Sequence, residues 1–440
     1  MIKVNTVLAL TFSLELCLYF TFHIYGVSIS FPRLFGFLIF IICIAVILSS
    51  YTFTNFTADY IKKWIFFLYY IFFVSLLNIL INYFFETLIP DFLFYFSKGF
   101  FVLIFQLLLY IYLPLIIIKT NKSFCSFLNI FRVIGGLSII FGIFDYLSQI
   151  FFNYDLIGRH FYDPIDVGKR FHGLFGEPRD AGVILIFLVF IESLYAHIKI
   201  NFIPGNRLNN KKIIFRYKLI SLIYFFLSLL AQSLSTFLGL ALGILFYFLL
   251  VEKKNLKFLV KYLFIILLIT IIFIFLVSTQ DRIALYYDSF ISMNKFLILK
   301  DFDKIPGVYR SQLTNIIPIY EFIERLSPKE IFYFLFGGGY SSSPILLKEI
   351  FYFDEYNYPA SHVSRWLTDI GLFGTIFYFI LIYIPGLKFI NNLSSTLMNK
   401  QVLFWYILFS SLAITHRSYA LFIGISMLII VLNINSKNKS

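Results

Sequence analysis

Residues 100–118 read FFVLIFQLLLYIYLPLIII, and no side chain in this stretch carries a charge. A helix needs about 20 mostly apolar residues to cross the hydrocarbon core of a bilayer. Inside that core every backbone amide needs a partner within the protein, so a helix is the expected conformation. The stretch therefore predicts a membrane-spanning helix.

Stretches of the same kind recur along the chain. Of the 440 residues, 60% are apolar and 13% are charged, with a mean hydropathy of +0.87. A soluble domain carries roughly 25% charged residues, so these values exclude a soluble class. We expect an all-α fold, a polytopic transmembrane helix bundle of about 12 spans. The expected spans are residues 6–24, 35–52, 65–85, 100–118, 133–152, 181–198, 219–233, 236–251, 262–278, 366–385, 402–415 and 418–434.

The basic residues give the expected orientation, because Lys and Arg favour the cytoplasmic side of a membrane. With the N-terminus inside, the cytoplasmic connectors hold many basic residues, and their acidic residues are Asp59 and Glu252. Both termini are then cytoplasmic, in a bacterial inner (plasma) membrane. This pattern also accounts for the formal charge of +13, so we expect no nucleic acid partner.

Two outer connectors differ from the short loops. Residues 1–278 hold the first nine expected helices and include the outer loop 153–180. Residues 279–365 form a large extracytoplasmic loop between spans 9 and 10, and residues 366–440 hold the last three helices with a cytoplasmic tail. Long loops are usually functional or folded in their own right. Candidate functional residues are therefore expected in these two loops.

The first candidate segment, residues 169–182, reads KRFHGLFGEPRDAG at the outer mouth of the sixth span. Arg170 and Arg179 can grip a diphosphate through planar, forked donors. Glu177 can accept a proton from a sugar hydroxyl or hydrogen-bond the sugar, and His172 stands between these residues. The alternative is a helix start with interfacial charges.

The second segment, residues 335–344, reads LFGGGYSSSP in the long loop. A triple glycine can pass close to a phosphate through its amides, which makes Gly338 and Tyr340 candidate binding residues. The segment is not a P-loop, because no Lys-Ser or Lys-Thr pair follows the glycines. A flexible turn is the alternative.

The third segment, residues 360–374, reads ASHVSRWLTDIGLFG. His362 precedes the tenth span, and Arg365 and Asp369 continue along one helical face. A neutral His is a reasonable base for a hydroxyl at an interface. The alternative is a structural His.

Four acidic residues fall within or at the edge of the expected spans: Glu15, Asp145, Glu192 and Asp369. Acids inside a membrane are functional candidates, and a chain of them would indicate a proton relay in a transporter. These four are scattered over different spans without a periodic partner. There is also no His/Cys cluster that indicates zinc, and we expect no metal and no cofactor.

Together the three segments resemble the bacterial O-antigen polymerase family (Wzy-type oligosaccharide repeat-unit polymerases), within the group that includes the O-antigen ligases. The matching residues are Arg170, Gly173, Glu177 and Pro178 in the first segment, Arg310 with residues 335–339 in the second, and Ser361-His362 before residues 371–374 in the third. The long outer loop before the tenth span is similar as well.

The resemblance implies a glycosyltransferase of lipopolysaccharide and surface polysaccharide biosynthesis. Such an enzyme joins oligosaccharide repeat units linked to undecaprenyl pyrophosphate on the outer face of the inner membrane. Its partners would be a lipid-linked glycan donor, a lipid-linked acceptor, the bilayer and a chain-length regulator protein. An O-antigen ligase is one alternative, and a polysaccharide flippase or exporter is an alternative from another class.

The resemblance also assigns roles to residues. The expected catalytic residues are Arg170, Arg310, Glu177 and His362. The expected substrate-binding residues are Arg179, Arg365, His172, Gly338 and Tyr340. The arginines would stabilise the charge that develops on the departing diphosphate, and either Glu177 or His362 would act as the base.

Overall fold

The fold is described from a computed structural model of the chain. The described residues are 4–17, 21–24, 27–30, 55–84, 89–154, 156, 171–175, 178–202, 207–231, 234–251, 260, 264–265, 267–268, 271, 291, 328–343, 362–392, 397–415 and 420–437. The expected span 35–52, most of the expected span 262–278 and most of the two outer loops lie outside these residues.

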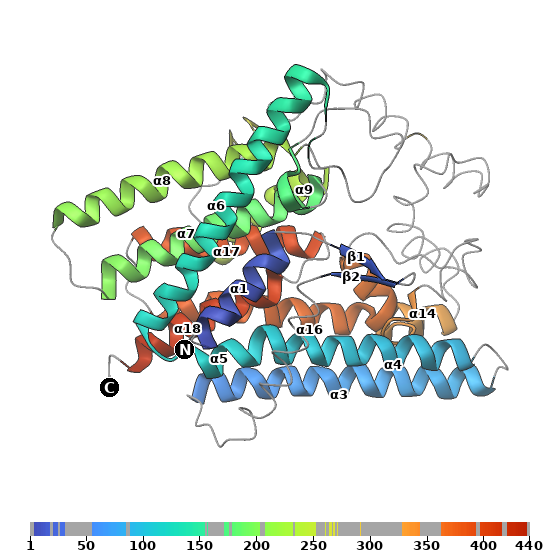
Figure 1. The fold of residues 1–440 in the computed structure, drawn as a ribbon. Coiled ribbons are helices and arrows are strands. Elements are labelled where there is room, and N and C mark those ends of the chain that lie inside the picture. Colours follow the sequence, from blue (N-terminus) through green and yellow to red (C-terminus); the bar gives the residue numbers. More distant parts are fainter. Residues whose placement is uncertain are drawn as a thin grey trace.

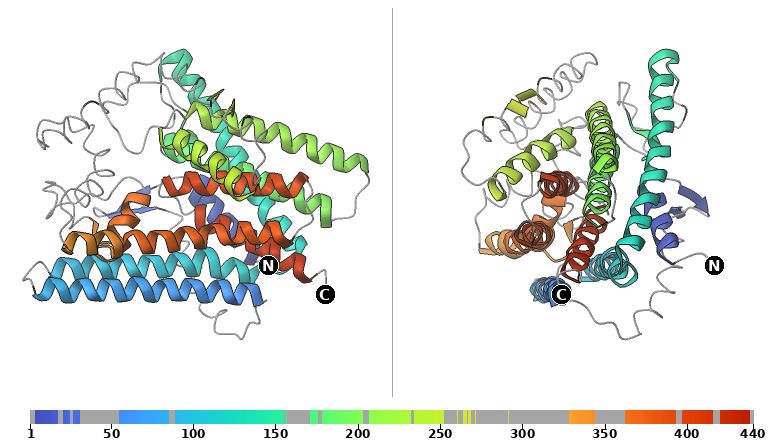
Figure 2. Two further views of the ribbon diagram at one scale, coloured as in Figure 1. Left: turned by 180° about the vertical axis from the view of Figure 1, so that it is seen from behind. Right: turned by 90° about the vertical axis from the view of Figure 1, so that its left-hand side faces the viewer.

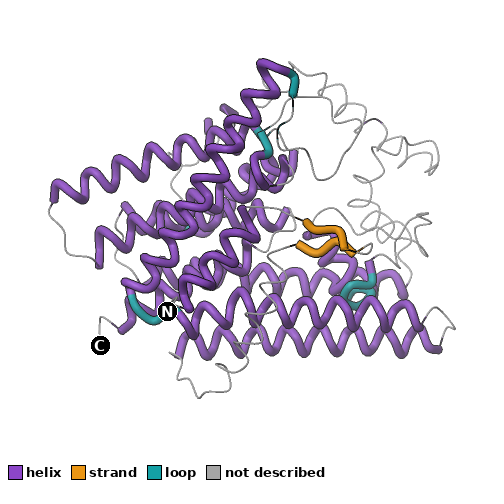
Figure 3. The backbone as a smooth tube through the Cα atoms, viewed as in Figure 1, coloured by secondary structure: helices purple, strands orange, loops and turns teal. Residues whose placement is uncertain are grey.

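Helices dominate the described residues, as Figures 1 and 3 show. The α-helices are α1 (Val4–Cys17), α3 (Asn55–Phe84), α4 (Ile89–Gln106), α5 (Leu113–Ile117), α6 (Asn121–Phe152), α7 (Pro178–Phe202), α8 (Arg207–Leu230), α9 (Leu234–Leu250), α14 (Pro328–Phe336), α16 (His362–Asn392), α17 (Leu397–Thr415) and α18 (Ala420–Lys437). A π-helix, η1 (Leu107–Tyr112), joins α4 to α5, and a 3-10 turn, η2 (Gly173–Phe175), precedes α7.

One expected span is shorter than the sequence predicted. α1 ends at Cys17, and residues within the expected span 6–24 form β1 (Thr21–Ile24), which pairs antiparallel with β2 (Val27–Ser30). The register pairs Ile24 with Val27. These strands are rich in β-branched and aromatic residues, which favour an extended conformation, and pairing satisfies their backbone groups as a helix would.

Within the described residues, six helices are long and apolar enough to cross a membrane. They comprise the central parts of α3, α6, α7, α8 and α16, and the continuous helix from α4 through η1 to α5. Shorter apolar helices lie in α1, α9 and α18. These findings fit a helical, membrane-embedded protein, and the count of about 12 spans stays a prediction.

Helix α7 lies at the centre of the packing. In the most apolar 18-residue stretch of α7, 94% of the residues are buried within the protein. The corresponding share for α8 is 28%. A helix that is apolar on all sides is stable where other helices surround it. The ring of Phe187 on α7 lies 5.9 Å from that of Phe131 on α6 and 4.9 Å from that of Phe409 on α17, between centroids. Aromatic contacts therefore fix the neighbours of α7.

The helices run between two ends of the bundle. Figures 1 and 2 place both chain termini at one end, and β1, β2, α14 and the start of α16 at the opposite end. We call this opposite end the far end. Helices α3 and α4 lie side by side along one edge and meet the far end where α3 ends and α4 begins.

The helix from α4 to α5 is irregular at η1. A π-helix holds one extra residue per turn, and such bulges are frequent at functional sites. The hydroxyl of Tyr110 in η1 donates a hydrogen bond to Oε1 of Glu15 on α1 at 2.6 Å. The bulge therefore gives an acidic side chain of α1 a partner within the bundle.

Candidate functional site

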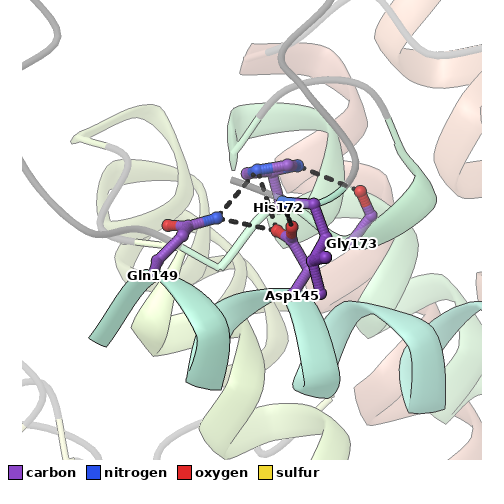
Figure 4. Close-up of polar contacts among 5 residues, drawn as sticks. Asp145, Gln149, His172 and Gly173 are labelled. Atoms are coloured by element: carbon purple, nitrogen blue, oxygen red, sulfur yellow. Dashed lines mark hydrogen bonds and ion pairs between the residues drawn. The ribbon is translucent and has the colours of Figure 1, made fainter. Parts of the chain in front are cut away.

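A buried polar cluster joins α6 to the segment that follows it (Figure 4). We call it the Asp145 cluster, formed by Asp145, Gln149 and His172. Nε2 of His172 lies 3.2 Å from Oδ2 of Asp145, and the amide of Gln149 donates to the same oxygen at 2.7 Å. The other oxygen, Oδ1, accepts the N–H of Leu156 at 2.8 Å. One carboxylate therefore binds the chain on both sides of residues 157–170.

Local sequence explains how this cluster forms. Asp145 and Gln149 are four residues apart on α6, so they lie on one helical face. After α6, Asn153 adopts the left-handed conformation with φ 53°, which ends the helix and turns the chain. A Cβ on Gly142 would lie 2.6 Å from Cα of Gly173. The absence of a side chain at Gly142 therefore lets the returning segment approach α6 closely.

The ring of His172 has a partner at each nitrogen. Nδ1 lies 3.0 Å from the carbonyl oxygen of Gly173, which can only accept, so Nδ1 carries a hydrogen. Nε2 lies 3.2 Å from Oδ2 of Asp145 and 3.1 Å from Nε2 of Gln149. The side chain is fully buried, so His172, a predicted substrate-binding residue, lies beneath the surface and holds the chain in place.

A second cluster surrounds the start of α16. We call residues 337–343 the glycine turn. Its backbone N–H groups donate within the protein: Gly337 to the carbonyl of Tyr333 at 2.7 Å, Gly338 to that of Thr368 at 2.8 Å, Tyr340 to Oγ of Ser75 at 2.9 Å, and Ser342 to the carbonyl of Gly339 at 3.1 Å. These amides therefore hold the turn against α3, α14 and α16.

Glycine is required where this turn meets α16. Gly337 has φ 82°, and Gly371 has φ 67° and ψ −174°, a region that is essentially open only to glycine. A Cβ on Gly371 would lie 2.4 Å from the backbone nitrogen of Gly337 and 2.4 Å from the carbonyl group of Leu335. The backbones of α16 and the glycine turn are therefore in direct contact.

Asp369 connects the glycine turn to a basic side chain. Its Oδ1 accepts the N–H of Ser343 at 2.8 Å, and its Oδ2 accepts Nε of Arg365 at 3.4 Å. The Asp369 side chain is buried, whereas 21% of the Arg365 side chain is exposed. The carboxylate therefore holds a guanidinium at the surface of the far end, where an anionic ligand can reach it.

Tyrosine and tryptophan side chains pack beside this pair. Tyr340 is buried, and its ring centroid lies 5.8 Å from that of Trp366. Trp366 in turn stacks on Tyr378 at 3.9 Å. Burial raises the pKa of the Tyr333 hydroxyl above its usual value, so Tyr333 stays uncharged at neutral pH. Trp366, the residue that follows Arg365, therefore packs against both Tyr340 and Tyr378.

The predicted site residues fall into three groups. Side chains or backbone contacts are described for His172, Gly338, Tyr340 and Arg365. Arg179 lies in the first turn of α7, and His362 is the first residue of α16. Arg170, Glu177 and Arg310 lie outside the described residues. Of these residues, the structure brings Gly338, Tyr340 and Arg365 together around the glycine turn.

Sequence reasoning missed two polar residues of α3. Ser75 accepts the N–H of Tyr340, and Nδ2 of Asn78 donates to the carbonyl of Gly337 at 3.0 Å. Both lie in an otherwise apolar stretch and are three residues apart, which puts them on one helical face. That spacing is the sequence signal that could have identified these two residues. The residues they bind, about 260 positions away in the chain, could not be deduced from it.

Each of the four acids inside the expected spans has a polar partner within the protein. Glu15 binds Tyr110, Asp145 binds His172, and Asp369 binds Arg365, while Glu192 on α7 accepts Nε of Arg132 on α6 at 2.7 Å. They therefore belong to four separate sites. Among the described residues, no group of three His, Cys, Asp or Glu side chains is placed to hold a metal ion.

Comparisons with known proteins leave the family open. The chain matches no protein-family model, and a search of the curated proteins finds no match. The resemblance to the O-antigen polymerases therefore rests on the quoted segments alone. The functional interpretation depends on those segments and on where the described parts of them lie.

Proposed function

We propose that the chain is an O-antigen or surface polysaccharide polymerase of the bacterial inner membrane. It joins oligosaccharide repeat units carried on undecaprenyl pyrophosphate, using one lipid-linked glycan as donor and another as acceptor. Both termini lie in the cytoplasm, about 12 helices cross the bilayer, and residues 279–365 form the loop on the outer side.

One observation carries this proposal. The described parts of the second and third candidate segments lie together at the far end, where the N–H of Gly338 binds the carbonyl of Thr368 and Asp369 accepts the N–H of Ser343. His172 lies beside the C-terminal half of α6. The glycine turn packs on the start of α16. A site for lipid-linked glycans requires its residues on one side of the membrane, and the contact between the second and third segments supports the proposal.

The chemistry needs no nucleotide, because the donor already carries an activated bond to diphosphate. Breaking that bond develops negative charge on the diphosphate, and guanidinium groups that contact it there stabilise the transition state more than the ground state. Arg365 is the described example, since Asp369 fixes its Nε and part of its side chain reaches the surface. Arg170, Arg179 and Arg310 complete the proposed phosphate site.

The acceptor hydroxyl must lose its proton as it attacks the sugar. Glu177 and His362 are the proposed bases: in the sequence Glu177 directly precedes α7, and His362 is the first residue of α16. In the sequence, each proposed base lies in the same segment as a proposed phosphate-binding arginine. The apolar helix surfaces around these segments suit the isoprenoid tails of the substrates.

Deleting the gene tests the proposal. The surface glycan of the deletion strain is separated on a gel beside that of the parent and of a complemented strain. We expect the long ladder to disappear and a band with a single repeat unit to remain. An unchanged ladder would overturn the proposal.

The same strain separates the alternative functions. A ligase deletion would strip all repeat units from the final carrier while lipid-linked polymer accumulates. A flippase deletion would leave lipid-linked single units in the cytoplasmic leaflet. Either pattern would replace the polymerase proposal with the corresponding function.

The orientation gives a separate prediction. A cysteine introduced as Ser289→Cys, within the expected outer loop, should react with a membrane-impermeant maleimide in spheroplasts. Ser436→Cys near the C-terminus should react only after the cells are lysed. Labelling of Ser289→Cys solely after lysis would place the loop in the cytoplasm and contradict the proposed site.

A second prediction concerns Arg310. A bidentate phosphate contact depends on the planar fork of Arg, which Lys cannot supply. We therefore expect Arg310→Lys to abolish the ladder as fully as Arg310→Ala when either variant is expressed in the deletion strain. Arg325→Lys, in the same expected loop, is the matched control and should restore the ladder. A full ladder with Arg310→Ala at a normal protein level would remove Arg310 from the site.

A further inference from the structure

A groove between α8 and α17 shares no lining residue with the Asp145 cluster or the glycine turn. Both helices pack on α7, and a groove of about 310 Å³ lies between them. This volume is at the lower limit for small-molecule sites, which span roughly 300–1,000 Å³. Its walls include Tyr217, Lys218, Leu222 and Phe225 on α8, and Phe404 and Trp405 on α17.

The groove has a fixed aromatic base. Nε1 of Trp405 donates a hydrogen bond to the hydroxyl of Tyr217 at 2.8 Å, which ties α17 to α8. The ring of Phe225 lies 6.0 Å from that of Trp405, between centroids. Lys218, Leu222 and Phe225 follow one another at helical spacing, so they line one face of α8. The walls are therefore mostly apolar, and Lys218, Ser221 and Gln401 add polar side chains to them.

The basic charge of this region is concentrated on α8. Lys211, Lys212, Arg216 and Lys218 are all exposed in its first half, and neither α8 nor α17 contains an acidic residue. Figure 1 shows that α8 begins at the end of the bundle where the termini lie. Of these four cations, Lys218 is the one that lines the groove.

The chemistry of the groove matches one class of ligand. Leu222 is 66% exposed on a helix apolar enough to span a membrane, so the groove opens toward acyl chains. Basic pockets between membrane helices on the cytoplasmic side bind anionic headgroups, and Lys binds phosphate as a point charge. We propose that the groove binds an anionic phospholipid, with one acyl chain along Leu222, Phe225 and Phe404 and its phosphate on Lys218.

This proposal does not depend on the proposed polymerase activity, and lipid binding tests it directly. Purified full-length protein in detergent receives phosphatidylglycerol or phosphatidylcholine of the same chain length. Native mass spectrometry then measures the lipid retained. We expect phosphatidylglycerol to be retained in preference. Lys218→Gln should weaken that binding about five-fold, the effect of removing one cation near an anionic headgroup.

Two matched controls distinguish the groove from general surface charge. Lys212→Gln removes the same charge from the same helix outside the groove and should leave phosphatidylglycerol binding unchanged. Leu222→Trp should fill the groove and reduce binding, whereas Ile223→Trp, on the opposite exposed face of α8, should not. Equal retention of the two lipids, or equal loss with Lys212→Gln and Lys218→Gln, would overturn the proposal. Preferential retention of an isoprenyl phosphate would assign the groove to the carrier lipid and overturn it as well.

Discussion

Replacing Gly371 by Ala is expected to prevent most of the protein from accumulating in a folded form. An L-residue at φ 67° and ψ −174° costs of the order of 1–3 kcal/mol. The new Cβ would also lie 2.4 Å from Gly337 N and from the Leu335 carbonyl group. These are backbone atoms that cannot rotate away, so the overlap adds roughly 1–3 kcal/mol or more. A folded protein is stable by only about 5–15 kcal/mol.

Size-exclusion chromatography of a fluorescent fusion measures this effect as the amount and the midpoint temperature of monodisperse protein. Gly136→Ala is the control, because its Cβ would meet no heavy atom closer than Tyr224 Oη, at 3.9 Å. In the middle of α6, Ala should be neutral or more stable by about 0.5–1 kcal/mol. Equal midpoints for Gly371→Ala and the parent chain would show that the two backbones are not in contact.

Asp145→Ala is expected to have the second largest effect. It removes the acceptor for the N–H of Leu156 and for the amide of Gln149, and it removes the partner of His172. A buried polar group left without its partner costs roughly 1–3 kcal/mol, and Asp145→Ala leaves more than one such group. We expect a loss of about 3 kcal/mol or more, seen as a lower midpoint temperature in detergent.

Graded variants separate the lost hydrogen bonds from the lost charge. Asp145→Asn keeps an oxygen for the N–H of Leu156 and should therefore be less destabilising than Asp145→Ala. Asp59→Asn makes the same change at an exposed position of α3 and should leave the midpoint unchanged. Asp145→Ala combined with His172→Ala should cost less than the sum of the two single changes, because the residues share one contact. Full additivity would contradict the cluster.

The long apolar helices could be predicted from the sequence because about 20 apolar residues are a strong local signal. Their ends could not, because polar residues at the ends have partners elsewhere in the chain. α3 begins at Asn55 rather than near residue 65, and the hydroxyl of Thr57 binds Asn433 on α18 at 2.7 Å. α6 begins at Asn121, where Thr120 and Ser123 form a capping box. The capping box is a sequence signal that an apolar window does not detect.

The candidate site was only partly predictable for the same reason. Local spacing singled out Arg365 and Asp369 as neighbours on one face, and the structure places them in contact. The contact of Asp369 with the N–H of Ser343 and that of Gly371 with Gly337 depend on how distant segments pack. No local pattern contains that information, so the glycines suggested a phosphate loop, whereas most of their described amides bind the protein itself.

The π-helix at Leu107–Tyr112 changes the direction in which side chains point between the two halves of one long helix. Removing a single residue there would restore regular α-helix and rotate one half against the other by about 100°. The rings of Phe96 and Phe100 could then keep their contacts with Phe72, or Tyr110 could keep its bond to Glu15, but both could not persist. The π-helix therefore allows Phe72 on α3 and Glu15 on α1 to contact the same long helix.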